Sequence, residues 1–335
     1  MTKSFNIAKN ICGILLFLIM IICIGTTVNA SEATPVVQPK PFILDMDFCT
    51  DVDDACALRV AANLHKMGVI NLRAVGLCVT GGNNLQAANG LLEYDGVHNI
   101  PIGRASQPIP DSSPYWGILS QYSKNMVAQD SVSLYRNIIW QEICNGNNPV
   151  TICTTGYVTN LADFMKSHAD VVIPYTGIDL LNMNQTRIYI TGGSYPDGMD
   201  NNFFYEEEAR EAIYWIVHNY GGKLYFIQNN CGGPIIVGDT IQKDPDYKND
   251  PLVKSLEAFG TNNGRAGWDP VSVWIAAQDQ PEDIGMLTEP VSVWINRYTG
   301  VNAFEYMPGS SYYRVYRAYE PEYYHNAINA LTLRY

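Results

Sequence analysis

The sequence predicts an α/β fold in which a mainly parallel central sheet is flanked by helices. Apolar, β-rich runs alternate with segments of helical periodicity, beginning with "FILDMD" at 42–47 and an apolar helical stripe after Asp53. The runs are apolar throughout, which is typical of strands buried on both faces of a parallel sheet. No composition break follows residue 41, so we expect a single Rossmann-like domain over residues 41–335.

The amino-terminal 40 residues predict export. Lys3 and Lys9 precede the 15-residue apolar run "ICGILLFLIMIICIG", and "VNA" ends at Ala30. This arrangement is typical of a signal peptide over residues 1–30, because the run is short for a bilayer span of roughly 20 residues. Residues 31–40 are Pro-rich and predict a linker. We therefore expect a secreted or periplasmic protein with no stable membrane insertion after cleavage near Ala30.

The charge of the chain restricts its partners. It carries 33 acidic and 21 basic residues, a net charge of −12. Such a surface repels nucleic acid polymers and anionic membranes, and it suits small neutral ligands or cations. The six cysteines beyond residue 30 stand singly in apolar contexts without metal-finger spacing, which indicates small core residues.

The expected elements follow one another in chain order. They are a strand at 42–47, a helix at 53–68, a strand at 70–80, a helix at 84–97 and a strand at 100–103. Later strands lie in "PVTICTTG", "TRIYITGGS" and "GKLYFIQNN", and the Tyr-rich tail predicts a strand followed by a helix. In open parallel sheets ligands bind beyond the carboxyl ends of the strands. We therefore expect the polar strand ends to converge, at 45–54, 81–84, 154–160 and 191–202.

Five aspartates crowd the end of the first strand with no basic residue between them: Asp45, Asp47, Asp51, Asp53 and Asp54. Their mutual repulsion grows as water is excluded. Helix capping accounts for Asp53 and Asp54 but not for five carboxylates. A divalent cation shared between Asp47 and Asp54 would supply the balancing charge. Ligation by oxygen alone indicates Ca²⁺ before Zn²⁺.

Two other kinds of site also use closely spaced aspartates. A calcium EF-hand loop needs Gly at position 6 and an acidic residue at position 12, where this chain has Thr50 and Cys56. A phosphatase of the haloacid dehalogenase type offers an Asp-x-Asp pair at a strand end, as Asp45 and Asp47 do. Cys49 stands where that class usually carries Thr or Val, and no later Lys or acidic pair is well placed. This second alternative stays open.

The segment "DMDFCTDVDDACAL" resembles the amino-terminal signature of the nucleoside hydrolases, in which Asp-x-Asp and a short spacer precede Asp-Asp-x-x-Ala-Leu. The spacer is two residues longer here than in the best-known members. Four further segments are similar to family segments and keep the family's order: "VTGGNN", "ICTTGYVTNLA", "IYITGGSYPDGMDNNF" and "GWDPVSVWIA". The resemblance covers about residues 41–280. It implies Ca²⁺-dependent hydrolysis of the N-glycosidic bond of ribonucleosides, giving free base and ribose.

The resemblance also implies a set of metal ligands. Asp47, Asp54, the carbonyl oxygen of Thr155 and Asp269 would hold the Ca²⁺ ion. Water bound to that ion would be the nucleophile, with Asp47 as its general base. An ordinary helix cap before Pro270 is the alternative role for Asp269, and Glu289 is an alternative ligand, but the Gly-rich loop before Asp269 and its Trp-Asp-Pro context favour Asp269.

Four more residues are implied at the sugar. Asp53 and Asn202 would bind the ribose hydroxyls, Asn83 would lie near the sugar, and Asp200 would stand toward the ribose 5′ end. Cleavage builds oxocarbenium-like positive charge on the ribose, which surrounding carboxylates stabilise. A polar loop equally accounts for Asp200 and Asn202, and a turn for Asn83.

The base side departs from the family pattern. Many members carry a His directly before the late Asp, where this chain has Trp268. Trp268 and Trp116 would stack on the leaving base, which leads to the hypothesis of a purine preference and a role in purine salvage. Core packing is the ordinary alternative for each Trp. These departures keep open a non-catalytic exported protein that binds ribosides or glycans. In either case the partner is a small molecule, and a homo-oligomer stays open.

Overall fold

The structure is a computed structural model that describes residues 38–124, 126–146 and 148–335. Pro39–Tyr335 form one compact unit. The predicted signal peptide at 1–30 lies outside the described residues, as do residues 31–37 of the predicted linker. Lys40, which the sequence placed in the linker, is already the first residue of a strand.

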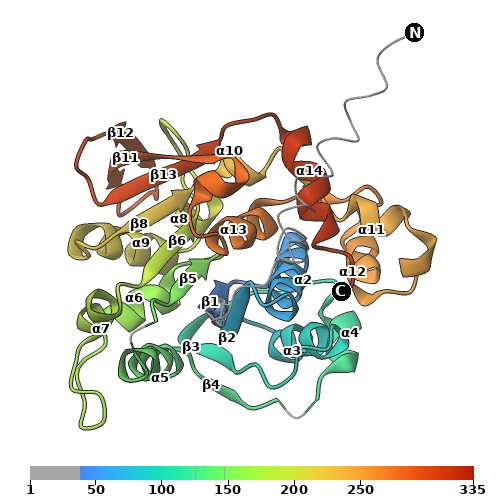
Figure 1. Cartoon of the computed structure of the whole chain (residues 1–335), viewed down its shortest axis with the longest axis horizontal. Helices are drawn as coiled ribbons and strands as arrows, with labels where there is room; N and C mark the ends of the chain where they lie inside the picture. The colour runs from blue at the N-terminus through green and yellow to red at the C-terminus, as the bar shows by residue number, and fades with distance from the viewer. Residues whose placement is uncertain (1–37, 125, 147) are drawn as a thin grey trace, which may run out of the picture. The chain divides into compact units, whose positions relative to one another are not determined.

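An eleven-stranded sheet forms the centre of this unit (Figure 1). Its spatial order is β4 (Ala128–Asp130), β3 (Ile102–Pro110), β2 (Ile70–Thr80), β1 (Lys40–Met46), β5 (Thr151–Thr154), β6 (Arg187–Thr191), β8 (Leu224–Ile227), β13 (Tyr312–Arg317), β11 (Met286–Ile295), β12 (Asn302–Tyr306) and β7 (Asp197–Gly198). In this spatial order, the first eight strands, from β4 to β13, pair in parallel with their neighbours. The last three strands, β11, β12 and β7, pair antiparallel. Two short strands, β9 (Ile236–Val237) and β10 (Arg265–Ala266), pair separately.

Helices cover both faces of the sheet (Figure 1). One core contains residues of α2 (Asp53–Lys66), α3 (Asn84–Tyr94), α4 (Trp116–Leu119), α10 (Asn229–Gly232), α11 (Asp239–Lys243), α12 (Pro251–Phe259), α13 (Trp268–Ala276) and α14 (Pro321–Ala330). The other contains residues of α5 (Ser131–Cys144), α6 (Thr159–Lys166), α7 (Gly177–Asn184), α8 (Asn201–Phe204) and α9 (Glu207–Asn219). None of the helices in the described ranges combines the length and the apolar composition needed to cross a bilayer.

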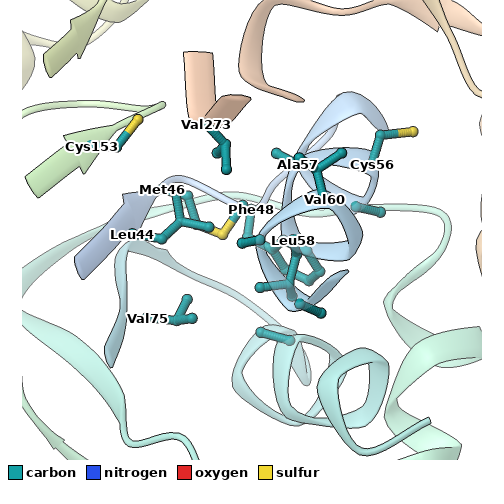
Figure 2. Packing of buried hydrophobic residues seen from close by; sticks show 14 of the residues in the cluster. Leu44, Met46, Phe48, Cys56, Ala57, Leu58, Val60, Val75, Cys153 and Val273 are labelled. Atoms are coloured by element: carbon teal, nitrogen blue, oxygen red, sulfur yellow. The ribbon is translucent and has the colours of Figure 1, made fainter. Parts of the chain in front are cut away.

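Strand β1 contributes side chains to both of these cores, one on each face of the sheet. Successive side chains of a strand point to opposite faces of its sheet. Phe42, Leu44 and Met46 are buried in the core that contains α2 and α13, whereas Ile43 is buried in the core that contains α5 and α6. Figure 2 shows Leu44 and Met46 pointing from β1 toward α2. The run at residues 42–44 is therefore apolar on both faces of the sheet, and the buried Asp45 follows it near the end of the strand.

The predicted fold class is confirmed. The strand at 70–80 coincides with β2, and the tail folds as β13 followed by α14. The third strand extends to Pro110, beyond the predicted 100–103, and α3 ends at Tyr94 rather than near 97. The β11–β12 hairpin was not predicted.

A buried ion-pair network fixes helix α2, whose first turn carries Asp53 and Asp54 of the aspartate cluster. Arg59 of α2 is fully buried, and its Nε donates to Asp95 at 2.5 Å while Nη2 donates to Asp250 at 2.9 Å. Its Nη1 donates to the carbonyl oxygen of Thr332 at 3.2 Å. Removing one partner of such a buried pair is costly, so these contacts tie α2 to the segments at α3, α12 and the carboxyl terminus.

Candidate active site

A pocket of about 150 Å³ opens beyond the carboxyl ends of β1, β5 and β6. The starts of helices α2, α8, α10 and α13 complete its wall. The predicted strand ends at 45–54, 154–160 and 191–202 contribute to it, whereas the segment 81–84 does not. Eight of the predicted site residues line the pocket: Asp47, Asp53, Asp54, Thr155, Asp200, Asn202, Trp268 and Asp269.

A sharp turn brings Asp54 back to the end of β1. Phe48 has a left-handed φ of 44°, and the backbone N–H groups of Phe48 and Cys49 donate to the two Asp54 carboxylate oxygens at 3.0 and 3.1 Å. Ligand atoms of Asp47, Asp54 and Cys49 all lie within 4.8 Å of one another. The turn therefore places two carboxylates and one thiol around a common point.

Gly156 allows the end of β5 to approach Asp47. A Cβ atom at Gly156 would lie 2.4 Å from the Asp47 backbone nitrogen and 2.7 Å from its Cγ atom. Any larger residue would push the two strand ends apart. Close packing of β1 and β5 thus brings the Thr155 carbonyl into the same pocket as Asp47.

Asp53 links the first turn of α2 to the first turn of α13. Its Oδ2 atom accepts a hydrogen bond from the Asp269 backbone nitrogen at 3.1 Å. Both carboxylates lie at helix amino termini, where the helix dipole favours negative charge. The packing of α13 against α2 therefore brings a late Asp to the early cluster, as the resemblance implied.

Burial opposes ionisation of the carboxyl groups in this pocket. It raises the pKa of Asp47 to about 6. Burial and neighbouring carboxylates raise the pKa values of Asp53, Asp54 and Asp269 well above their usual range. Among the described residues that line the pocket, Arg265 is the only basic one. The carboxylate and carbonyl oxygens present fit a divalent cation, whose charge would let these groups stay ionised.

Asn202 joins the ends of two neighbouring strands. Its Nδ2 atom donates to the carbonyl oxygens of Thr155 at 3.3 Å and Thr191 at 3.1 Å. Its backbone nitrogen donates to Asp200 Oδ1 at 3.1 Å, and Asp200 caps α8. Burial raises the pKa of Asp200 to about 6, although N–H donors, including that of Asn202, oppose the rise. Asp200 and Asn202 are thus fixed beside the strand ends.

Two predicted residues are not brought into the pocket. Trp116 is buried, with its Nε1 donating to the carbonyl oxygen of Phe48 at 2.9 Å and its ring packed beneath Gly82. Asn83 precedes α3 and donates its side-chain amide to Ser120 Oγ. These placements match core packing and a turn. The alternative ligand Glu289 also lies elsewhere, on β11, and is paired with Arg314.

Four pocket residues with notable contacts had no role assigned from the sequence, although Cys49 and Asp51 lie in the strand end at 45–54 that was expected to converge here. Cys49 contributes its thiol, and Asn229 accepts a hydrogen bond from Trp268 Nε1 at 3.1 Å. Asp51 and Arg265 form an ion pair with a shortest distance of 2.7 Å. The only sequence features that pointed to this pair were the position of Arg265, three residues before Trp268, and that of Asp51 in the lengthened spacer.

Comparison with known proteins identifies the fold. No protein-family model and no curated protein matches the sequence. The inosine-uridine preferring nucleoside hydrolase from Bacillus anthracis is similar in structure, with a TM-score of 0.63 and 14% identity over 88% of this chain and 99% of that chain. The inosine-guanosine nucleoside hydrolase gives a TM-score of 0.61 and 14% identity, over 88% and 98%. The type III effector XopQ complexed with adenosine diphosphate ribose gives 0.61 and 14%, over 88% and 93%. The chain therefore has a nucleoside hydrolase-like fold.

The raised pKa of Asp200 predicts a pH-dependent difference in stability. Above its folded-state pKa of about 6 the carboxylate is charged in both states, and burial then destabilises the folded state. Below about pH 3 it is protonated in both states, so this penalty is absent. Asp200→Asn keeps a capping oxygen without the charge. We expect the variant's free energy of unfolding to exceed that of the wild type by about 1–3 kcal/mol above pH 7, by much less at pH 4, and by almost nothing below about pH 3.

Urea denaturation in EDTA at pH 4, 5, 6 and 7.5 measures this difference directly. The chelator removes any contribution of bound metal in both proteins. A gap between variant and wild type that is the same at pH 4 and pH 7.5 would show that Asp200 does not titrate as the structure indicates.

Proposed function

We propose that the protein is a Ca²⁺-dependent ribonucleoside hydrolase that releases free base and ribose. The observation that carries this proposal is the convergence of Asp47, Asp53, Asp54 and Asp269 in one pocket on a nucleoside hydrolase-like fold. The signal peptide predicted at residues 1–30 supports export, so we propose that the enzyme is secreted or periplasmic.

The chain's own residues would carry the following roles. Asp47, Asp54, Asp269 and the Thr155 carbonyl would hold Ca²⁺, which lowers the pKa of a coordinated water when it is bound. Asp47 would accept the proton of the attacking water, because its carboxylate lies in the same pocket as the other proposed ligands and is ionised when a cation is bound. The ring of carboxylates would stabilise the positive charge that develops on the ribose.

Recognition of the sugar would use the groups fixed beside the strand ends. Asp53 and Asn202 are held by the Asp269 and Thr155 backbone, respectively, so both would meet the ribose hydroxyls without reorganising. Asp200, which is buried, would face the 5′ end of the ribose. Prior fixation of these groups favours ribosides over nucleosides that lack a hydroxyl.

The two alternatives differ in their support. A dehalogenase-type phosphatase is not favoured, because the similar solved structures are nucleoside hydrolases and effector proteins. A binding protein for ribosides keeps some support from the effector complexed with adenosine diphosphate ribose. The retained carboxylate pocket favours catalysis over binding alone.

Hydrolysis tests the proposed function. We expect wild-type protein with Ca²⁺ to release reducing sugar from ribonucleosides, because water attack and ribose stabilisation both use residues present in the pocket. Asp47→Ala and addition of EDTA should each lower kcat at least about 100-fold, since general-base catalysis contributes about 10²–10⁴-fold. Activity that neither change affects would refute the mechanism, and an inactive wild type across a nucleoside panel would favour the binding protein.

Metal binding can be measured apart from activity. Calorimetric titration with Ca²⁺, Mg²⁺ and Zn²⁺ should show Ca²⁺ binding that weakens at least about tenfold in Asp54→Asn, because the variant loses a charged oxygen ligand. Asp246→Asn, on an exposed 3₁₀ turn at 245–247, is the matched control and should bind like the wild type. The nearby Cys49 thiol is a ligand type that favours Zn²⁺ over Ca²⁺. Zn²⁺ binding that exceeds Ca²⁺ binding and is lost in Cys49→Ser would overturn the assignment of Ca²⁺.

Base preference depends on Trp268. A purine offers a larger stacking surface than a pyrimidine, so kcat/KM for inosine should exceed that for uridine. Stacking on an aromatic side chain is worth about 1–3 kcal/mol per base, so Trp268→Ala should lower kcat/KM for inosine by about 5- to 150-fold. Trp116→Phe, which alters an indole outside the pocket, should leave the inosine-to-uridine ratio unchanged. A strong uridine preference would contradict the purine hypothesis.

A further inference from the structure

The guanidinium of Arg265 is held in one position at the pocket wall. Its Nε and Nη2 atoms donate to the Asp51 carboxylate at 3.0 and 2.7 Å, a two-point contact that fixes the plane of the group. The guanidinium carbon also lies 5.1 Å from the Trp268 ring centroid and 5.3 Å from that of Phe259. An arginine packed in this way loses little further entropy when it binds a ligand.

One edge of this guanidinium is left without a protein partner. The bonds to Asp51 use Nε and Nη2, and Nη1 has no hydrogen-bond acceptor in the part of the chain that the structure describes. Both Arg265 and Asp51 line the pocket and are about one-third exposed. A base bound in this pocket would therefore have a fixed N–H donor without a protein partner at the pocket wall.

The proposed reaction needs such a donor on the base side. When the bond between C1′ and the base nitrogen breaks, its electron pair moves to the base, which becomes an anion unless it is protonated, and a hydrogen-bond donor stabilises that anion. None of the histidines in the described ranges lines the pocket. Hydrogen bonding to Asp51 raises the pKa of Arg265 further, so this residue donates a hydrogen bond but cannot give up its proton.

We propose that Arg265, positioned by Asp51, stabilises the negative charge that develops on the departing base. This inference rests on the proposed function. The water oxygen bonds to C1′ and gives one proton to Asp47, while the C1′–N electron pair remains on the base. The anionic base is hydrogen-bonded to Nη1 of Arg265 and then takes a proton from solvent. Asp51 is a positioning residue, which gives the aspartate in the lengthened spacer a function.

Two leaving groups separate this role from sugar binding. Inosine releases hypoxanthine, which is a basic anion unless it is protonated, whereas p-nitrophenyl riboside releases a nitrophenolate that is stable without a hydrogen-bond donor. Removing a donor to a developing anion typically costs 10²–10³-fold in kcat. We expect Arg265→Met to lower kcat/KM about 100-fold for inosine and less than about fivefold for p-nitrophenyl riboside. For inosine, we expect the kcat/KM of Arg265→Lys to lie between those of the wild type and Arg265→Met, because lysine keeps the charge but loses the two-point contact with Asp51.

Asp51→Asn tests the positioning role. The variant keeps Arg265 but weakens the contact that orients it, so we expect kcat for inosine to fall about tenfold with KM changed less than twofold. Arg297→Met is the matched control, because Arg297 forms an exposed ion pair with Glu211 outside the pocket. Its ratio of inosine to p-nitrophenyl riboside turnover should equal that of the wild type.

Each result is decisive. A wild type that cleaves neither substrate refutes the proposed function. A wild type that cleaves both, with an Arg265→Met variant that loses both equally, shows that Arg265 acts on the sugar or the fold and overturns this inference alone. Unchanged inosine turnover in Arg265→Met overturns it as well. Retained p-nitrophenyl riboside turnover reports that the variant's active site is folded.

Discussion

Repulsion among buried carboxylates is the constraint on which the rest of this pocket depends. Asp47, Asp53, Asp54 and Asp269 share a space from which water is largely excluded, and burial raises the pKa of each. The fold compensates with backbone N–H groups directed at Asp54 and with two helix amino termini. These partial charges reduce the repulsion without neutralising it. The geometry thus retains a demand for positive charge, which a divalent cation or the transition state of N-glycosidic cleavage would meet.

Much of the fold was predictable because buried parallel strands leave a plain pattern in sequence, as β1 and β2 do. The hexapeptide "PVSVWI" shows where local pattern fails, since 270–275 is helical in α13 and 290–295 is extended in β11. Both settings tolerate the proline. Pro270 lies in the first turn of α13, where no intrahelical N–H bond is needed. Pro290 lies where β11 changes its partner from β13 to β12. Tertiary packing decides between the two, and neither copy encodes it.

The site was predictable where its residues lie close in sequence, at the end of one strand and the start of the next helix. Asp47 and Asp54 are seven positions apart, and a single turn brings them together. The position of Trp116 could not be predicted, because an indole suits a buried core as well as a ligand-binding site. Its hydrogen bond to the carbonyl oxygen of Phe48, which places it in the core, is apparent only in the structure. Asp51 and Arg265 are separated by 214 residues, so their pairing depends on how α13 and its preceding loop pack against α2. No local pattern carries that information.

The origins of the pocket residues separate two kinds of constraint. The groups assigned to metal and ribose follow strand ends or begin helices, so the sheet fixes their spacing. The groups assigned to the base lie away from the central sheet: Asp51 in the lengthened spacer, Arg265 in the short strand β10, and Trp268 at the first residue of α13. A change in a loop leaves the sheet intact, whereas a change in the first set moves strands against one another. Under the proposed function, chemistry at the ribose would therefore be tied to the fold, while chemistry at the base would be free to vary, and Asp51 with Arg265 would be the form that variation takes in this chain.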